Sequence, residues 1–420
     1  MKQVLFITYY WPPSGKASLH WPLFVMKHLP SAGWHASVLT TEDDTFSPRD
    51  ESLLGEIPLD VRVEKTAGFE PFNLYRRFLG KEENIPLVAS ETISRSQESL
   101  RHKISVWIRI NLFVPDARVG WMLSAVHGAR RLISDQHVDA VVSIGPPHTA
   151  HVIGSRVSKK NNIPHVPVMI DPWTDISYYK NLHRSRLTLL LDTKLEKRVM
   201  EHAAQVVFVT KSLQENFISK YPFLAEKSHV LYWGYNEESF RGIRQECDHS
   251  AEVILHAGNI FDYQNPEYFW KEVADERSRG RNLRLRFLGT VGPGVKSSIR
   301  MHGLEPYTDY EGFVPYDQVV RELFRASYLL MCPTERRHVP GKLFEYLRAG
   351  RPIIAFGDDN EEVASILREG NAGVLLPHHY GDTKAFEELR SVSPNIRFAL
   401  QYNRQSIAQG LANVLDKTKR

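Results

Sequence analysis

Residues 340–355 read PGKLFEYLRAGRPIIA, and this stretch contains one complete unit of an alternating α/β pattern. A loop that ends at Gly341 is followed by apolar side chains at helical spacing, and Gly350 is typical of the residue that ends a helix. Pro352 then leads into a short apolar run, which predicts a buried strand. Helices that alternate with buried strands favour a parallel sheet covered on both faces.

The same alternation extends over most of the 420 residues. In the first half, the predicted strands are residues 3–8, 34–40, 61–63, 138–144, 165–170, 205–209 and 230–233. In the second half, they are residues 253–257, 283–288, 328–332, 352–356 and 373–376. Residues 234–250, between the two sets, are polar and charged, which predicts an interdomain connection. We therefore predict the α/β class, with two Rossmann-like domains whose parallel sheets face a central cleft.

The predicted domains are residues 1–235 and residues 236–400, followed by a last helix over residues 401–420. Four apolar residues fall at helical spacing in this last segment, so we expect an amphipathic helix that packs on another part of the chain. They are Ile407, Leu411, Val414 and Leu415.

Composition and charge exclude several classes of protein. Hydrophobic residues make up 42% of the chain and charged residues 24%, and no apolar run reaches the ~20 residues of a membrane-spanning helix. The start of the chain does not read as a signal peptide, and its two cysteines, Cys247 and Cys332, suit a reducing compartment such as the cytoplasm. Residues 1–235 carry a net charge of +5 and residues 236–420 one of −1. This excess suits an anionic surface or acceptor and is too small to indicate nucleic acid.

The loop and helix start around Gly341 contain the strongest candidate site. A helix that opens there directs free backbone N–H groups outward, and Lys342 adds a positive charge beside them. This combination favours a bound phosphate group. Glu345 lies one turn further along, where its carboxylate can accept hydrogen bonds from sugar or ribose hydroxyls. The alternative interpretation is a solvated lysine and a glutamate on the helix surface.

Two candidates lie in the first half of the chain. Asp171 follows the predicted strand 165–170, at the edge where α/β proteins bind ligands. It could orient a hydroxyl group, act as a general base, or cap the turn before Pro172. His148 could donate a hydrogen bond to a sugar or a phosphate. Although His148 and His151 have the spacing of a metal pair, no third ligand follows at a suitable spacing, so we predict no metal site.

Residues 91–118 break the α/β alternation. Apolar residues at ragged helical spacing are interspersed there with arginine and lysine. The segment is compatible with a helix that lies on anionic lipid, or with a helix that packs on the core with its charges in water.

Six segments follow one another in an order typical of one enzyme family. They are residues 7–15, 28–40, 145–151, 163–174, 255–260 and 340–355. They resemble the glycosyltransferases with the GT-B fold, especially the large retaining group called glycosyltransferase family four. Residues 340–355 resemble the donor-site motif of that group, and residues 145–151 and 163–174 resemble segments common in its polysaccharide and lipopolysaccharide branch.

The resemblance implies a nucleotide-diphosphate sugar, UDP- or GDP-linked, held mainly by the second domain, and an acceptor held by the first. Glu345 would hold the ribose, and Lys342 with the backbone of Gly341 would hold the diphosphate. No cofactor is implied, and the helix 401–420 would cross back to the first domain. The other donor-binding residues implied are Gly15, Gly258, Asn259, Phe313, Val314 and Arg336.

The sequence departs from the family pattern at three points. Arg337 stands where the family has a second glutamate, and residues 261–266 hold no base where the family commonly has an arginine and a lysine. No histidine unambiguously matches the family's histidine on the catalytic face. Neutralisation of the leaving diphosphate would therefore depend on Lys342, assisted by Arg336 or Arg337. The predicted catalytic residues are Lys342, Asp171 and His148.

We predict a metal-independent, retaining glycosyltransferase that acts on a glycan or lipid-linked acceptor in cell-surface polysaccharide synthesis. The sequence contains no Asp-x-Asp, which argues against the metal-dependent GT-A type of sugar transfer. The expected location is the cytoplasm or the inner face of the cell membrane, in peripheral contact with anionic lipid. The alternatives are a nucleotide-sugar epimerase on the same scaffold and a non-catalytic binder of nucleotide sugar or glycan.

Overall fold

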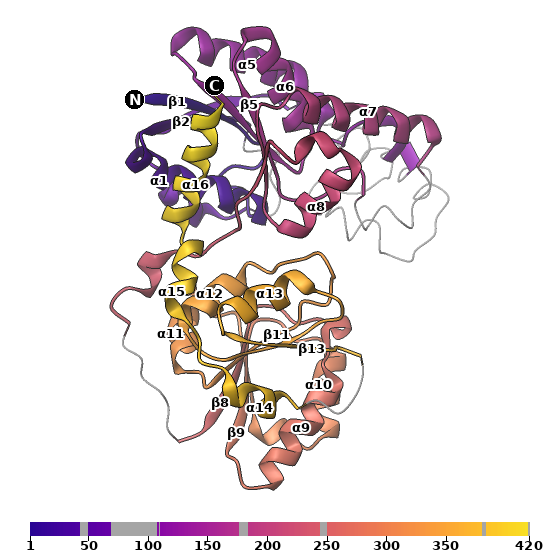
Figure 1. Ribbon diagram of the computed structural model, residues 1–420, viewed down its shortest axis with the longest axis vertical. Coiled ribbons are helices and arrows are strands. Elements are labelled where there is room, and N and C mark those ends of the chain that lie inside the picture. Colours follow the sequence, from indigo (N-terminus) through magenta and orange to yellow (C-terminus); the bar gives the residue numbers. More distant parts are fainter. Residues whose placement is uncertain are drawn as a thin grey trace. The chain divides into compact units, whose positions relative to one another are not determined.

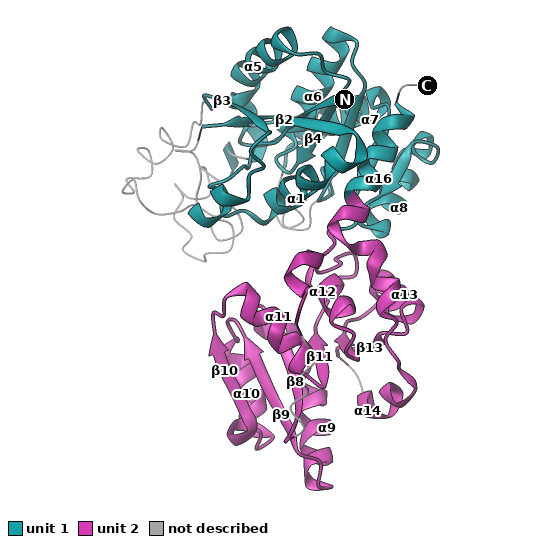
Figure 2. Cartoon of the chain, turned by 90° about the vertical axis from the view of Figure 1, so that its left-hand side faces the viewer, with its two compact units in different colours: residues 1–232, 408–420 teal, residues 233–407 magenta. Residues whose placement is uncertain are grey.

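The computed structural model describes residues 1–42, 49–68, 107–108, 110–175, 184–243, 250–379 and 384–418. The chain forms two compact units, which Figure 2 shows in different colours. Unit 1 consists of Met1–Tyr232 together with Ala408–Arg420, and unit 2 consists of Trp233–Ile407. The predicted interdomain connection begins just after the division between the units, and its residues 244–249 lie outside the described residues.

Unit 1 is built on a seven-stranded parallel sheet in the order β3-β2-β1-β4-β5-β6-β7. Its strands are β1 Lys2–Ile7, β2 Trp34–Thr41, β3 Arg62–Thr66, β4 Ala140–Gly145, β5 His165–Met169, β6 Val206–Phe208 and β7 Ser228–Val230. Its helices are α1 His20–His28, α5 Met122–Asp135, α6 Thr149–Asn161, α7 Arg186–His202, α8 Lys211–Lys220 and most of α16 Arg404–Lys417. Helices α5 and α6 cover one face of the sheet and α1 covers the other (Figure 2).

Unit 2 is built on a six-stranded parallel sheet in the order β10-β9-β8-β11-β12-β13. Its strands are β8 Glu252–Ala257, β9 Leu283–Leu288, β10 Thr308–Gly312, β11 Tyr328–Met331, β12 Ile353–Phe356 and β13 Gly373–Leu376. Its helices are α9 Glu267–Ser278, α10 Pro293–Met301, α11 Tyr316–Arg325, α12 Lys342–Ala349, α13 Glu361–Glu369, α14 Ala385–Glu388 and α15 Ile396–Ala399. Helices α12 and α13 lie on one side of this sheet and α9 and α10 on the other (Figure 1).

The central strands are apolar on both faces because helices cover both faces of each sheet. Every residue of β4 is buried, and so is every residue of β12. The predicted helix and strand of residues 340–355 are confirmed as α12 and β12, with Gly350 directly after the helix. The α/β class and the two parallel-sheet, Rossmann-like units are likewise confirmed.

One predicted strand is wrong in its position. Residues 230–233 were expected to form the last strand of the first half, but β7 covers Ser228–Val230. Its neighbour β6 is a short strand that ends at Phe208, whose carbonyl accepts the backbone N–H of Leu231. Beyond Phe208, β6 offers no further residue with which the chain could pair, so residues 231–233 leave the sheet.

The direction of strand addition reverses once in each sheet, between β1 and β4 in unit 1 and between β8 and β11 in unit 2. The loops on the two sides of such a point diverge and leave a crevice at the carboxyl ends of the strands. The predicted site residues follow the carboxyl ends of β1, β4 and β5 in unit 1. In unit 2, they follow β8, β10 and β11.

Candidate functional site

Lys342 is the first residue of α12, and its side chain reaches the end of β8. Its Nζ lies 3.2 Å from Nε2 of His256 on β8. A Cβ atom added to Gly258, which follows β8 with φ of +98°, would lie 3.2 Å from the same Nζ. The structure therefore brings together Lys342 and Gly258, two of the predicted donor-binding residues. The missing side chain of Gly258 leaves room for the ammonium group.

His256 acts as a neutral acceptor for Lys342. Its Nδ1 lies 3.0 Å from the backbone carbonyl of Leu330, which can only accept, so Nδ1 carries the proton and Nε2 presents its lone pair to Lys342. Burial and the Lys342 charge hold the pKa of His256 well below its usual value. His256 thus fixes the ammonium group at the reversal point of the sheet without adding charge there.

Tyr346 connects α12 to the two central strands. Its hydroxyl accepts the backbone N–H of Ala257 at 2.8 Å and lies 3.3 Å from the carbonyl of Leu330. These contacts hold the start of α12 against the carboxyl ends of β8 and β11. Tyr346 is fully buried, so the position of Lys342 depends on a rigid part of unit 2.

Glu345 lies on α12 one turn after Lys342 and accepts a hydrogen bond of 2.7 Å from the hydroxyl of Tyr316. Burial raises the pKa of Glu345, while the Tyr316 hydrogen bond and the Lys342 charge oppose the shift. Tyr316 begins α11, directly after the loop that contains Phe313 and Val314. One carboxylate oxygen is therefore oriented by Tyr316, and the loop of Phe313 is linked to α12 through this pair.

The loops after β8 and β9 pack closely against each other, through backbone atoms and through the side chain of Asn259. The side chain of Asn259 accepts the N–H of Thr290 at 2.9 Å. Gly289 has φ of +125°, and a Cβ there would lie 2.6 Å from the carbonyl oxygen of Gly258. Gly289 also pairs with Gly312, just before the 92% exposed ring of Phe313 and the half-buried Val314. The loops that follow β8, β9 and β10 thus meet at the carboxyl ends of these strands.

The segment 261–266, which lacks the family's basic pair, has a structural role. The carboxylate of Asp262 accepts the backbone N–H of Gly294 at 2.8 Å, so it caps the start of α10. The amide of Gln264 donates to the carbonyl of Cys332 at 2.9 Å. A carboxylate already occupies the helix start of the glycine-rich stretch 289–294, so this stretch does not offer an anion site.

Asn360 holds the loop that precedes α12. Its side chain is fully buried, and its amide donates to the carbonyls of Glu335 and His338 at 3.0 Å each and to that of Pro333 at 3.4 Å. Its amide oxygen caps α13 by accepting the N–H of Val363. Arg336 and Arg337 are exposed in the loop that Asn360 holds.

We expect Asn360→Ser to weaken donor binding, because serine keeps the helix-capping oxygen but loses the amide donors. The carbonyls of Pro333, Glu335 and His338 lose this donor, so the free energy of unfolding should fall by about 1–3 kcal/mol. Chemical denaturation and nucleotide titration measure both effects. Asn395→Ser is the matched control, since Asn395 also caps a helix of unit 2. Unchanged nucleotide affinity in Asn360→Ser would contradict the proposed role of the loop.

Lys342 predicts a pH dependence of donor binding. Burial lowers its pKa to about 8. The amine of Lys342 is therefore protonated and positively charged below about pH 8, and it loses this charge as the pH rises through that value. The apparent affinity for a diphosphate should fall by about tenfold per pH unit above that value. Titrations of a nucleoside diphosphate from pH 6.5 to 9.5 measure this slope. Lys342→Arg should flatten it, since arginine stays charged; an equal slope in this variant would assign the titration elsewhere.

In unit 1, His148 is buried rather than open to a ligand. Its ring stacks on Trp173 with centroids 4.9 Å apart, and its Nε2 donates to the carbonyl of Pro172 at 3.1 Å. Burial lowers the pKa of His148 to about 3, so the ring is neutral. The hydroxyl of Ser143 lies 2.8 Å from His151 and 2.7 Å from His165. His148 therefore supports the loop that contains Asp171, because it contacts Pro172 and Trp173 of that loop.

Two buried carboxylates of α7 hold the loop that contains Asp171. Asp192 accepts from the indole N–H of Trp173 at 2.7 Å, and Glu196 accepts from the backbone and the hydroxyl of Thr174 at 3.1 and 3.0 Å. Asp171 itself is exposed after β5. Two carboxylates of this loop are exposed, Asp171 and Asp175, and Asp175 lies 3.8 Å from the ammonium group of Lys220. Gly15 is half-buried after β1, and the described contacts do not join it to Asp171 or His148.

The fold and the unit 2 site together define a two-domain α/β protein with a cation held at the reversal point of its second sheet, as expected for a GT-B glycosyltransferase. Residues 251–389 match the family described as Glycosyl transferases group 1, and residues 88–239 match Glycosyltransferase Family 4. The chain is a glycosyltransferase of the family-four type. A search of curated proteins finds no sequence match.

Three solved structures illustrate the shared fold. Anabaena HepE in complex with UDP is 15% identical with a TM-score of 0.63, over 99% of this chain and 100% of that chain. The lipopolysaccharide outer core galactosyltransferase WaaB is 12% identical with a TM-score of 0.58, over 99% of each chain. A putative UDP-N-acetylglucosamine 2-epimerase from Listeria monocytogenes is 12% identical with a TM-score of 0.55, over 98% and 95% of the two chains. Among the described residues, no helix is long and apolar enough to span a membrane.

Proposed function

We propose that this glycosyltransferase moves a sugar from a UDP-linked donor, held by unit 2, to a glycan or lipid-linked acceptor held by unit 1. The single observation that carries the proposal is the ammonium group of Lys342, fixed by His256 beside Gly258 at the reversal point of the sheet. The choice of UDP is supported by HepE, which shares the fold and was solved with UDP and with UDP-glucose.

In the proposed reaction, the acceptor hydroxyl attacks the anomeric carbon on the face from which the diphosphate leaves. The bond from that carbon to the leaving oxygen breaks, and a phosphate oxygen takes the hydroxyl proton. Lys342 neutralises the charge that develops on the diphosphate. Glu345, oriented by Tyr316, accepts from the ribose hydroxyls, and exposed Asp171 orients the acceptor hydroxyl. The reaction requires no metal and no cofactor.

The proposed pathway is cell-surface polysaccharide or lipopolysaccharide synthesis, at the inner face of the cell membrane. This proposal is supported by the fold that the chain shares with WaaB, a lipopolysaccharide outer core galactosyltransferase. Residues 91–106 of the segment predicted to touch lipid lie outside the described residues. Helix α7 offers a described surface for the same contact, because its exposed face combines leucines with basic residues. Its exposed residues are Arg186, Leu187, Leu189, Leu190, Leu191, Lys194, Lys197, Arg198, Glu201 and His202.

We expect the α7 surface to bind vesicles that contain anionic lipid. Leu187 and Leu190 are 67% and 69% exposed, and burial of a leucine contributes about 1.5–3 kcal/mol. The double variant Leu187→Asp/Leu190→Asp should therefore reduce vesicle binding by roughly tenfold or more. Leu123→Asp is the matched control, since Leu123 is an exposed leucine of α5. Equal binding by the double variant and the control would exclude α7 as the contact.

The experiment that tests the proposed function begins with a thermal-shift screen of UDP- and GDP-sugars. The sugar that raises the melting temperature most is then assayed for release of nucleoside diphosphate, with and without a membrane extract. Extract-dependent release that is lost in Glu345→Ala supports transfer. Conversion of the sugar without extract would instead indicate an epimerase, an alternative that the fold shared with the Listeria structure keeps open. Binding without any turnover would indicate a non-catalytic binder.

A further inference from the structure

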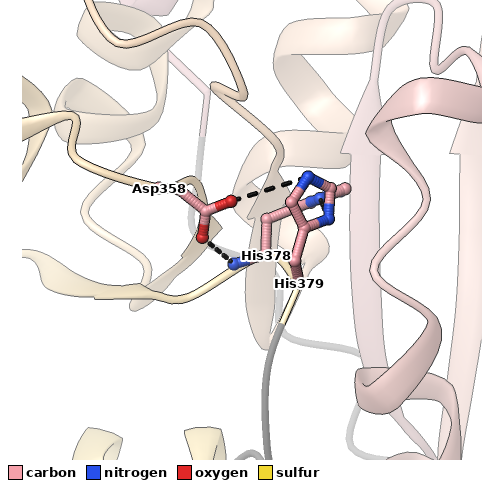
Figure 3. A group of neighbouring side chains, drawn as sticks. All are labelled: Asp358, His378 and His379. Atoms are coloured by element: carbon pink, nitrogen blue, oxygen red, sulfur yellow. Dashed lines mark hydrogen bonds and ion pairs between the residues drawn. The ribbon is translucent and has the colours of Figure 1, made fainter.

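A second cluster of side chains lies in unit 2, at the carboxyl ends of the last two strands of its sheet. Asp358 follows β12, and His378 and His379 follow β13 (Figure 3). One ligand atom from each residue lies within 4.8 Å of the others. No other group of three His, Cys, Asp or Glu residues in the described part of the chain has this spacing.

The two imidazoles approach each other through their Nδ1 atoms, and the carboxylate of Asp358 lies nearer the Nε2 atom of His379. Nδ1 of His378 lies 2.9 Å from Nδ1 of His379, and one carboxylate oxygen of Asp358 lies 3.6 Å from Nε2 of His379. The other carboxylate oxygen accepts the backbone N–H of His378 at 2.9 Å, which fixes the turn between the two loops (Figure 3). Metal–nitrogen bonds of about 2.0–2.1 Å place two nitrogen ligands about 2.9 Å apart in an octahedral site and about 3.3–3.4 Å apart in a tetrahedral zinc site. The 2.9 Å between the two Nδ1 atoms matches the octahedral arrangement, and a tetrahedral zinc site would need the two rings to separate by about 0.5 Å.

The residue types and their exposure also suit a metal ion. Imidazole nitrogen with carboxylate oxygen is a ligand set for zinc, nickel and related dications. His378 is 5% exposed and is held by the core of unit 2, whereas the side chain of His379 is 64% exposed. A buried ligand gives the site a fixed position. The exposed ligand leaves access for the ion and for water at the remaining coordination positions.

We propose that Asp358, His378 and His379 form a binding site for a first-row transition-metal dication such as Zn²⁺ or Ni²⁺. The three residues follow β12 and β13, whereas Lys342 begins α12 and Gly258 follows β8, so this site shares no residue with the proposed donor site. Asp358 stands two residues before Asn360, which holds the loop of Arg336. A bound ion would therefore stabilise the two loops that follow β12 and β13 and, through Asn360, the start of α12.

Isothermal titration of untagged, chelator-stripped protein with ZnCl₂ and with NiCl₂ tests this site. The wild type should bind one equivalent, and its melting temperature should rise with metal concentration. His379→Ala and Asp358→Asn should each weaken binding by roughly tenfold or more. His137→Ala is the matched control, because His137 lies 3.4 Å from the Asp139 carboxylate without a second imidazole. It should bind metal as the wild type does.

Two results would overturn the proposal. One is a wild type that binds neither ion at one equivalent, and the other is unchanged affinity in both His379→Ala and Asp358→Asn. UDP titration of the same stripped samples separates this site from the proposed function. Nucleotide affinity should persist in His379→Ala, and its loss in every sample would count against the donor site rather than the metal site.

Discussion

Lys342→Ala is expected to lower kcat/KM for transfer by roughly 10²–10³-fold and to abolish the thermal shift caused by UDP. The variant removes the cation that lies beside Gly258 and leaves His256 neutral, so the diphosphate meets no positive charge at this edge of β8. The fold should not change, because the Lys342 side chain is half-buried and α12 is held by Tyr346.

Lys271→Ala is the matched control for this prediction. Lys271 is an exposed lysine of α9 that pairs with Asp275, in the same unit. Its removal should leave both nucleotide affinity and turnover within about twofold of the wild type. If Lys342→Ala binds UDP as the wild type does, the donor lies elsewhere and the proposed site is wrong.

Asp192→Ala is expected to lower the free energy of unfolding by about 3–5 kcal/mol. Asp192 is 1% exposed and forms a 2.7 Å ion pair with Arg184, whose side chain is 4% exposed. Burial raises the pKa of Asp192, and the bonds from Arg184 and Trp173 oppose that shift. Removal of the carboxylate leaves the guanidinium and the Trp173 indole without this acceptor in the interior. The Asp171 loop should then loosen, and acceptor-dependent turnover should fall with stability.

Denaturant unfolding, followed by tryptophan fluorescence, measures this loss. Asp135→Ala is the matched control, since Arg62 and Asp135 also form a 2.7 Å ion pair but have half-exposed side chains. An exposed pair contributes about 0–1 kcal/mol, so this variant should unfold near the wild-type midpoint. If the two variants lose similar amounts of unfolding free energy, burial of the Asp192–Arg184 pair is not the reason for its contribution to stability.

The sequence was sufficient for the fold class, because most of its strands are apolar and many of its turns are marked by proline and glycine. Residues 340–355 illustrate this: loop, helix, Gly350 and strand all occur where the pattern predicts them. The sequence did not predict β10, because this edge strand of unit 2 is polar and only partly buried. The edge strand β7 was misplaced, because a short half-buried strand has no continuous apolar run to mark it. The ends of edge strands depend on where the neighbouring strand stops, and a linear pattern does not contain that information.

The candidate site was predicted only in part. Lys342, Glu345 and Gly258 occur in recognisable local patterns, but His256, Tyr316 and Asn360 act through contacts across 22 to 86 positions of the chain. The one available signal was a histidine inside the otherwise apolar strand 253–257, since a buried polar residue needs a partner. His148 shows the opposite case, in which a histidine near a predicted edge packs inward against Trp173.

The discontinuity of unit 1 has a consequence for protein synthesis. Unit 1 needs residues 408–420, and within them Asp416 accepts from the indole N–H of Trp34 while Leu411 and Leu415 are completely buried. A ribosome therefore releases every residue of unit 2 before it completes unit 1. Unit 2 can fold during translation, whereas part of the apolar surface of unit 1 stays uncovered until residues 408–420 have been synthesised. Chaperone dependence in the cell should accordingly concentrate on the half of the chain that is made first.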